Sequence, residues 1–154
     1  MPETNSARHG LPFLLTGQAQ KELTHNEALV RLDALLHPVV EAQQTSPDMD
    51  ISMADTGKIW LVAANMPNAA PNEWTGHAGE LAYWTGGSWR FLEPTTGMSI
   101  WNRQNNSRLI YISGQWTVAP SITNVTGGIN IDVEARAAMN ALLHHLQIIG
   151  ITRL

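Results

Sequence analysis

The spacing of hydrophobic residues predicts a helix near the start of the chain. Apolar residues recur at helical intervals at Leu29, Val30, Leu32 and Leu36. Pro38 prevents continuation of the helix beyond His37. Thr24 followed by Glu27 is typical of a capping box, in which each side chain binds a free backbone amide at the start of the helix. We therefore predict a helix over residues 25–37.

From residue 58 the hydrophobic period changes from about 3.6 to about 2, which indicates strands. Runs of aromatic and β-branched residues, separated by Gly, Pro and Asn clusters, predict six strands, at 58–63, 79–85, 88–92, 98–103, 109–113 and 116–118. The pairs Gly86-Gly87 and Gly114-Gln115 are candidate hairpin turns, because glycine tolerates the positive φ of tight turns.

Two of the predicted hairpins repeat one pattern. Residues 81–89 align with 109–116 at an offset of 28, with a one-residue gap in the turn. Each copy has a Tyr before the turn and a Trp after it, so we expect a cross-strand aromatic pair in each hairpin. Such a pair contributes about 0.2–1 kcal/mol. This repeat assigns Trp89 and Trp116 to hairpin packing.

A second helix is predicted over 132–150, with Asp132 as N-cap and Gly150 as C-terminal stop. Its apolar residues are spaced 4, 3, 4 and 3 apart and form a heptad seam of Ala135, Met139, Leu142, Leu146 and Ile149. Two heptads alone do not establish a coiled coil. The seam either packs against the β module of its own chain or forms an oligomer interface through Met139, Leu142, Leu146 and Ile149.

These elements predict an α+β fold with an N-terminal helical segment, a small antiparallel aromatic-rich β module and a C-terminal amphipathic helix. A loop at residues 45–48 is the best candidate boundary. We divide the chain into an N-terminal docking segment with its helix (1–46), the aromatic module (57–119) and the C-terminal helix (130–154). The 154 residues suit one domain overall.

The composition excludes several classes of protein. The chain is 44% hydrophobic and 14% charged, with net charge -4 and no cysteine. The apolar content rules out wholesale disorder, and the lack of a basic stripe disfavours nucleic-acid binding. Disulfides and thiolate metal sites are excluded. The run Leu11–Leu15 is broken by Pro12 and lacks a basic lead-in, so we expect neither a signal peptide nor membrane insertion. The low charge predicts that much of the surface is buried between subunits.

Metal sites receive little support from the sequence. His144 and His145 are adjacent on a predicted helix and point about 100° apart, so they do not share an ion. The segment from Asp48 begins like a calcium loop but has Met53 where glycine is needed and Ile59 where glutamate is needed. We expect no metal and no cofactor.

Catalysis is the minority hypothesis. Glu73, His77 and Glu80 lie within a few residues of Trp74 and could form a glycosidase-like corner. That chemistry requires two carboxyl groups at a suitable distance. A glycine-flanked loop with a solvated histidine is the commoner structure, so we expect a protein that is not an enzyme.

Binding is the better-supported chemistry. Nine of the ten aromatic residues lie between Trp60 and Trp116. Exposed indole rings stack on the C–H faces of sugars, while neighbouring amide and guanidinium groups bond the hydroxyls. The loop after Trp101 is rich in Asn, Gln and Arg. We predict a glycan- or partner-binding surface formed by Trp74, Trp84, Trp101, Asn102, Arg103 and Asn105.

Four segments carry a resemblance to a known family: GLPFLLTGQAQKELTHNEAL (10–29), GHAGELAYW (76–84), GSWRF (87–91) and EARAAMNALL (134–143). The first is long and idiosyncratic. Together they resemble a family of uncharacterised proteins of bacterial prophages and gene transfer agents, whose members look like virion head spike or tail fibre components. The likeness covers nearly the whole chain.

The resemblance implies a noncatalytic structural and adhesion component of a phage-like particle, made in the bacterial cytoplasm and carried on the particle surface. Its expected partners are capsid or tail proteins of the same particle, host surface polysaccharide, and further copies of the chain in a trimer or pentamer. The alternative is a polysaccharide-cleaving spike domain. A polar stretch is the expected docking surface: Gln18, Gln20, Lys21, Glu22, His25 and Asn26.

Overall fold

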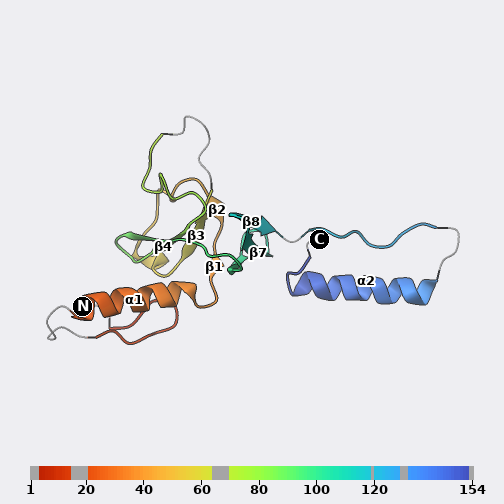
Figure 1. Cartoon of the computed structure of the whole chain (residues 1–154), viewed down its shortest axis with the longest axis horizontal. Coiled ribbons are helices and arrows are strands. Elements are labelled where there is room, and N and C mark those ends of the chain that lie inside the picture. The colour runs from red at the N-terminus through yellow and green to blue at the C-terminus, as the bar shows by residue number, and fades with distance from the viewer. Residues whose placement is uncertain (1–3, 15–20, 64–69, 119, 129–131, 153–154) are drawn as a thin grey trace.

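The computed structural model describes residues 4–14, 21–63, 70–118, 120–128 and 132–152 (Figure 1). It contains two helices, α1 (Lys21–Leu35) and α2 (Val133–Ile148), and a short 3-10 turn (Met53–Asp55). The strands are β1 (Val39–Val40), β2 (Gln43–Gln44), β3 (Ile59–Val62), β4 (Leu81–Trp84), β5 (Trp89–Leu92), β6 (Ser99–Asn102), β7 (Ser107–Ile112) and β8 (Gln115–Val118). The predicted α+β fold is confirmed.

The strands form two mixed sheets of four, in the orders β1-β6-β7-β8 and β2-β3-β4-β5. Each sheet is an antiparallel meander of three strands with one short parallel strand added at its edge. All six predicted strands are confirmed. The strands β1 and β2 are missed by sequence reasoning because two residues are too few to show an alternating pattern.

The two hairpins of the repeat are present, and the aromatic pair of one of them differs from the prediction. Tyr111 lies opposite Trp116 as expected, with ring centroids 5.3 Å apart. In the other hairpin the partner of Trp89 is Trp84, not a tyrosine. The Thr85 amide donates to the Ser88 carbonyl (3.0 Å) and leaves a two-residue turn between them. The one additional residue of this copy of the repeat therefore lies in the strand before the turn, not in the turn itself.

The predicted turn at Gly86-Gly87 is confirmed, whereas the turn of the second hairpin is shifted by one residue from the predicted Gly114-Gln115. It consists of Ser113 and Gly114, whose φ angles are 53° and 80°. Gln115 belongs to β8 and lies opposite Ile112. Two consecutive positive φ values are typical of a type I′ turn, whose twist matches that of the flanking strands.

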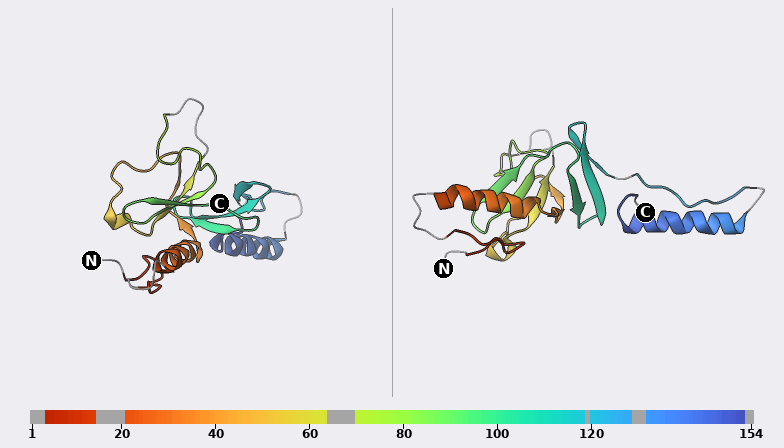
Figure 2. Two further views of the ribbon diagram at one scale, coloured as in Figure 1. Left: turned by 60° about the vertical axis from the view of Figure 1, so that its left-hand side comes forward. Right: turned by 60° about the horizontal axis from the view of Figure 1, so that its bottom comes forward.

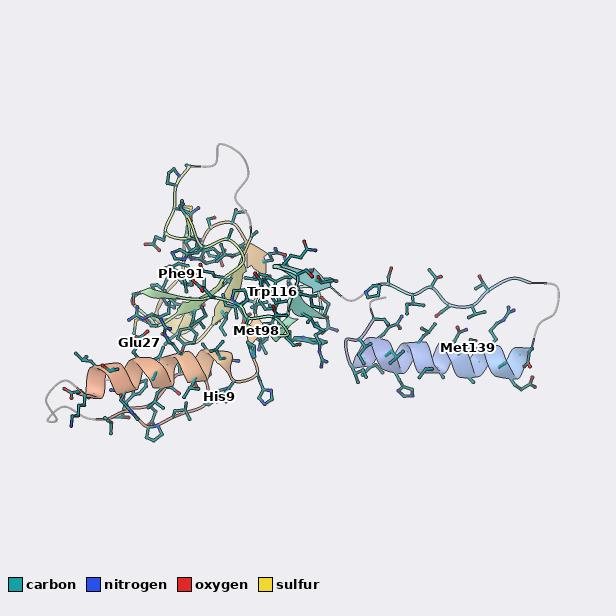
Figure 3. The ribbon with its side chains drawn as sticks, in the orientation of Figure 1. His9, Glu27, Phe91, Met98, Trp116 and Met139 are labelled. Atoms are coloured by element: carbon teal, nitrogen blue, oxygen red, sulfur yellow. The ribbon has the colours of Figure 1, made fainter. Side chains whose placement is uncertain are left out.

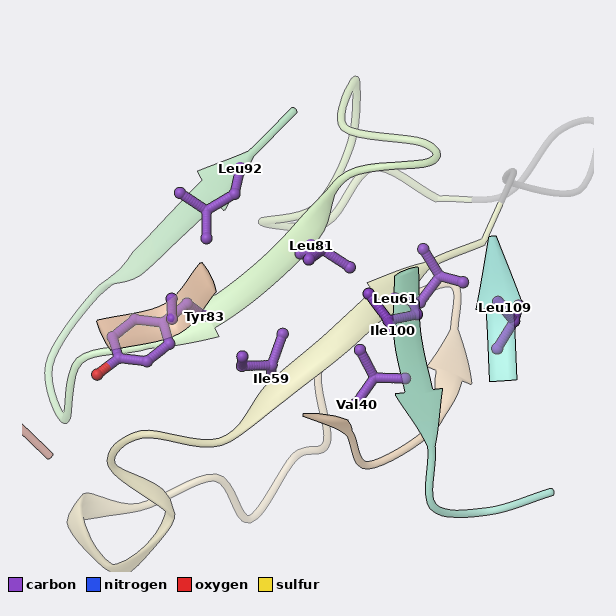
Figure 4. Packing of buried hydrophobic residues seen from close by; sticks show 9 residues of the cluster. Val40, Ile59, Leu61, Leu81, Tyr83, Leu92, Ile100 and Leu109 are labelled. Carbon is purple, nitrogen blue, oxygen red and sulfur yellow. The ribbon is translucent and has the colours of Figure 1, made fainter. Parts of the chain in front are cut away.

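One hydrophobic core joins α1 to both sheets. Its buried residues are Ala34, Val40, Ile59, Leu61, Leu81, Tyr83, Leu92, Ile100 and Leu109 (Figure 4). Burial of one such large aliphatic side chain stabilises the fold by about 1.5–3 kcal/mol. Since α1 and β1 contribute to this core, the predicted docking segment and the aromatic module form one packed body.

The predicted capping box at Thr24 is wrong, because α1 already includes Lys21 and Thr24 lies inside the helix. Glu27 instead pairs with Arg90 of β5, at 3.1 Å from its Nε atom, and this ion pair ties α1 to the sheet. The end of α1 agrees better with prediction. The helix stops at Leu35, and His37 takes a positive φ of 48° directly before the proline.

The N-terminal segment is clasped to α1 by Asp33, whose side chain is fully buried. Its carboxylate accepts hydrogen bonds from the Ser6 hydroxyl (2.7 Å) and from the backbone amides of Arg8 (2.9 Å) and His9 (2.7 Å). The Tyr83 hydroxyl of β4 lies at 3.4 Å. The Arg8 guanidinium donates to carbonyls at the end of α1, those of Asp33, Ala34, Leu36 and His37. This clasp satisfies carbonyls that a helix end leaves unpaired.

The helix α2 forms an arm that extends away from this body (Figure 1 and the right-hand view of Figure 2). Its predicted ends are confirmed: the Asp132 carboxylate accepts from the Ala135 amide (2.8 Å), and Gly150 follows the last turn with φ 71°. The Ile151 amide donates to the Leu146 carbonyl (2.9 Å), which completes a Schellman motif.

Segment 120–128 lies alongside α2 and forms the other half of the arm (Figure 1). The Arg136 guanidinium donates to the Gly127 carbonyl (2.7 Å), and the Asn140 side chain accepts from the Val125 amide (3.2 Å). No residue of α2 is buried. Packing of the seam along its own β module is therefore contradicted. Neither of the described helices has the length and apolar character required to cross a bilayer.

Candidate functional site

Four tryptophans form a cluster on the face of β3, β4 and β5 that lies opposite α1. Trp89 is at its centre, with ring centroids 5.5 Å from Trp60, 5.1 Å from Trp74 and 4.8 Å from Trp84. The first two contacts are edge-to-face, an arrangement that stabilises aromatic pairs by about 0.5–1.5 kcal/mol beyond the burial of their area. Most of this cluster is structural.

Trp74 is 1% exposed, so its predicted contact with a ligand is wrong. The reason is local. The Asn72 side chain accepts from the Trp74 amide (2.8 Å), and this turn directs the indole onto the rings of Trp60 and Trp89. The half-buried Trp84 donates from its indole nitrogen to the Ser52 carbonyl (2.8 Å), which leaves only part of its ring accessible.

The residues of the catalytic alternative lie at the rim of this cluster. Glu73 accepts from the Trp89 indole nitrogen (2.8 Å). The Nδ1 atom of His77 lies 3.0 Å from the Glu80 carboxylate, and the imidazole stacks on Phe91, with centroids 3.6 Å apart (Phe91 is labelled in Figure 3). Both carboxylates therefore have a partner within the chain, and the stacked imidazole is held between Glu80 and Phe91.

A groove of about 410 Å³ crosses the outer face of the other sheet. It is lined by His37, Pro38, Val39, Ser99, Ile100, Trp101 and Arg108. Alternation along β6 places Ser99 and Trp101 on the outer face, and Trp101 lies opposite Arg108 of β7. Its parallel neighbour on the other side is Val39 of β1. The groove thus combines one half-buried indole with hydroxyl, imidazole and guanidinium groups.

Of the predicted binding residues, only Trp101 lines this groove. Asn102 is 1% exposed, and its side chain accepts from the Asn105 amide (3.2 Å). Its predicted ligand contact is therefore wrong, because the side chain points inward and closes the β6–β7 turn. Arg103 is exposed and lies 3.4 Å from the Glu41 carboxylate. Asn105 is exposed.

Sequence reasoning missed the polar residues of the groove. Two of them could have been found from the β6–β7 hairpin. If Trp101 is taken to face outward, alternation places Ser99 on the same face, and the register places Arg108 opposite Trp101. His37 could not be found in this way, because it comes from the end of α1 and reaches the groove only through the parallel pairing of β1 with β6. The Arg8 guanidinium holds the His37 carbonyl at 2.9 Å.

The predicted docking residues lie at the start of α1. Gln18 and Gln20 fall outside the described residues. Lys21 and His25 are exposed, and Glu22 is half-buried. The Asn26 side chain bonds both backbone groups of Leu14, at 2.9 and 3.0 Å, so it holds the N-terminal segment in place.

The predicted interface residues of α2 are open to solvent. Met139 is 56% exposed, Leu142 59% and Ile149 51%, while Leu146 is half-buried. Across the described ranges, no group of three or more His, Asp or Glu side chains is arranged to hold a metal ion.

Comparison with known proteins places the body of the molecule in a family. Residues 25–117 match the family described as "Protein of unknown function (DUF2793)". The chain belongs to this family. The match runs from α1 to β8, so the arm lies outside it. No curated protein and no solved structure matches the chain.

Proposed function

We propose that this DUF2793 protein is a noncatalytic structural and adhesion component of a phage-like particle, a spike or fibre protein or its base. It mounts on capsid or tail and contributes to attachment to host surface polysaccharide. The particle role is supported by the resemblance of segments 10–29, 76–84, 87–91 and 134–143. The observation that carries the adhesion role is the groove at Trp101.

The groove has the chemistry that a neutral sugar requires. Its volume of about 410 Å³ lies within the range of about 300–1,000 Å³ typical of small-molecule sites. The Trp101 ring offers an apolar face to the C–H groups of a pyranose, while Ser99, His37 and Arg108 bond hydroxyls. One such shallow site binds weakly, and several copies on one particle raise the avidity.

Binding is favoured over cleavage by the partners of the carboxylates. Glycoside hydrolysis requires two carboxyl groups that flank the scissile bond. Glu73 accepts a hydrogen bond from Trp89 and Glu80 contacts His77, at 2.8 and 3.0 Å. Neither belongs to the groove at Trp101.

Retention of purified host polysaccharide on the immobilised protein tests the proposal. We expect wild-type protein to retain the glycan and Trp101→Ala to lose about tenfold or more in affinity, because the stacking face is removed. Arg108→Ala should weaken retention less. Trp84→Ala is the matched control, since it removes an indole from the tryptophan cluster rather than from the groove.

Three results would contradict the proposal. Equal retention by wild type and Trp101→Ala would refute stacking in the groove. Loss of glycan retention in Trp84→Ala but not in Trp101→Ala would place the glycan contact at the tryptophan cluster instead of the groove. Shortened glycan chains after incubation, abolished by Glu73→Gln or Glu80→Gln, would establish the cleaving alternative.

A further inference from the structure

The chain exposes more surface than a protein of its size needs. Its accessible surface is 10278 Å², whereas a folded monomer of 16.9 kDa exposes about 7,700 Å². The excess is about 2,600 Å² per chain. Permanent protein–protein interfaces bury about 2,000–5,000 Å² in total. Since each partner supplies half of that total, about 1,000–2,500 Å², the excess of one chain is close to the upper end of what one partner buries.

The arm carries an apolar seam that the described residues leave largely uncovered, since of its four large side chains only Leu146 is half-buried. Met139, Leu142 and Ile149 are each more than half exposed, and Figure 3 shows Met139 on the arm, away from the body. The neighbouring side of α2 is occupied, because Arg136 and Asn140 bind segment 120–128. No residue of this 16-residue helix is buried, whereas most helical stability in proteins comes from tertiary packing of an apolar face. A packing partner for the seam would supply the missing stabilisation.

The seam is complementary to another copy of itself. Its five residues are uncharged, and the formal charges of α2 are confined to Glu134 and Arg136 in the first turn. Copies that meet along the seam therefore bury no like charges. Leu146 and Ile149 occupy consecutive heptad positions a and d, a combination that favours three or four strands.

The surface at the base of the arm indicates the relative direction of the copies. Ile151, which follows α2, lines a hollow of about 230 Å³ together with Ile110 and Ile112 of β7. All three are exposed apolar side chains. Copies arranged in parallel bring these bases together around one axis, whereas an antiparallel pair places them at opposite ends and leaves them uncovered.

We propose that three copies of this chain associate in parallel, with the α2 seams on a common axis and the exposed isoleucines of the β7 face packed around its base. The observations that carry it are the unburied seam, the excess surface and the apolar base. This inference is independent of glycan binding, so either proposal can fail alone.

The mass of the full chain in solution is the first test. At micromolar concentration we expect three times 16.9 kDa, by light scattering or native mass spectrometry. Leu142→Lys should reduce the mass to that of one chain, because the lysine would lie in the seam of every copy. The substitution is compatible with the folded single chain, since Leu142 is exposed there. Ala137→Lys adds the same charge on the opposite, exposed side of α2 and should leave the mass unchanged.

Cross-linking tests the direction. Because the chain has no cysteine, a single introduced thiol reports only on its own position. A disulfide joins residues whose Cα atoms lie roughly 4.4–6.8 Å apart. In a parallel bundle the Cα atoms of Ile149→Cys in neighbouring copies should come within this range, so covalent dimers should form. In a fully overlapping antiparallel pair these positions would be about 20 Å apart. Ala137→Cys on the far side should not cross-link.

A monomeric wild-type chain would overturn the inference. So would an oligomer that persists in Leu142→Lys, or equal cross-linking of Ile149→Cys and Ala137→Cys. A monomer that still retains polysaccharide would refute only the assembly, and a trimer that retains none would refute only adhesion.

Discussion

Replacement of Asp33 by alanine tests whether the N-terminal clasp stabilises the body. The carboxylate is fully buried and accepts from Ser6, Arg8 and His9 at 2.7–2.9 Å. Alanine removes the acceptor and leaves these three donors without their partner. It also releases the segment that carries the Arg8 guanidinium, which bonds the carbonyls at the end of α1.

The magnitude follows from the donors. A hydrogen bond to a charged group contributes about 1.5–3 kcal/mol, and an unpaired buried donor costs about 1–3 kcal/mol. A plain sum over three donors overestimates the effect, because the amides of Arg8 and His9 are only partly buried and regain water. We expect Asp33→Ala to lower the free energy of unfolding by about 3–5 kcal/mol. For a domain of this size the melting temperature falls by about 6–20 °C.

Asp33→Asn preserves the shape of the side chain and one acceptor but turns an NH2 group toward a donor. We therefore expect it to lower the free energy of unfolding by an intermediate amount, about 1–3 kcal/mol. Asp50→Ala is the matched control, because Asp50 is exposed, and its effect should stay within about 0.5 kcal/mol. The assay is urea unfolding followed by circular dichroism at one fixed protein concentration, since self-association would change apparent stability.

Hydrogen exchange provides a local readout of the same contact. In wild-type protein the Arg8 and His9 amides should exchange slowly, and in Asp33→Ala they should exchange like an unstructured segment. If Asp33→Ala and Asp50→Ala unfold at the same urea concentration, the clasp does not stabilise the body and the reasoning is refuted.

Two further predictions concern the base of the arm and a surface ion pair. A Cβ atom at Gly150, where φ is 71°, would lie 2.5 Å from Cζ3 of Trp101, so Gly150→Ala should displace the indole and cost about 1–2 kcal/mol of left-handed strain. Hydrogen exchange of the Ile151 amide should be faster in Gly150→Ala than in the wild type, and an unchanged exchange rate would contradict this prediction. The hydrogen bond from Lys58 Nζ, at 2.6 Å, holds the pKa of Asp55 below its ordinary 3.8, with further lowering by hydrogen bonds from Ser52. Ionised Asp55 thus stabilises the fold above pH 3.8, and this contribution is lost as the pH falls through the lowered pKa. NMR titration should show a higher Asp55 pKa in Lys58→Met, still below 3.8, and an unchanged value would contradict the assignment.

The local sequence pattern determined most of the secondary structure. The six strands of the meanders, the caps of α2 at Asp132 and Gly150, and the exit of α1 before Pro38 are all present. Each depends on residues close together in the chain: alternating side chains, a carboxylate before a helix, a glycine that tolerates positive φ. The heptad seam of α2 is likewise a local pattern, and it lies on one open side of the helix.

Tertiary structure decided which polar and aromatic residues face solvent. Trp74 and Trp84 have the same ring, but Trp74 is buried against Trp60 and Trp89, because the Asn72 turn folds the loop back over β3 and β5. Asn102 is likewise turned inward to close its loop. No local pattern contains this information, since it depends on which distant segment covers a given face.

The groove and the Asp33 clasp have the same origin. His37 meets Trp101, and Asp33 meets Ser6 and Arg8, only after β1 pairs with β6 and the N-terminal segment folds back along α1. Composition and periodicity describe what a segment forms by itself, whereas these contacts join residues far apart in sequence. The sequence alone therefore determined most of the elements and the apolar seam of α2, whereas only the tertiary structure showed that the α2 residues stay unburied. The pairing of the two-residue strand β1 with β6 decided which residues line the groove at Trp101, and the buried Asp33 carboxylate decided where the N-terminal segment lies.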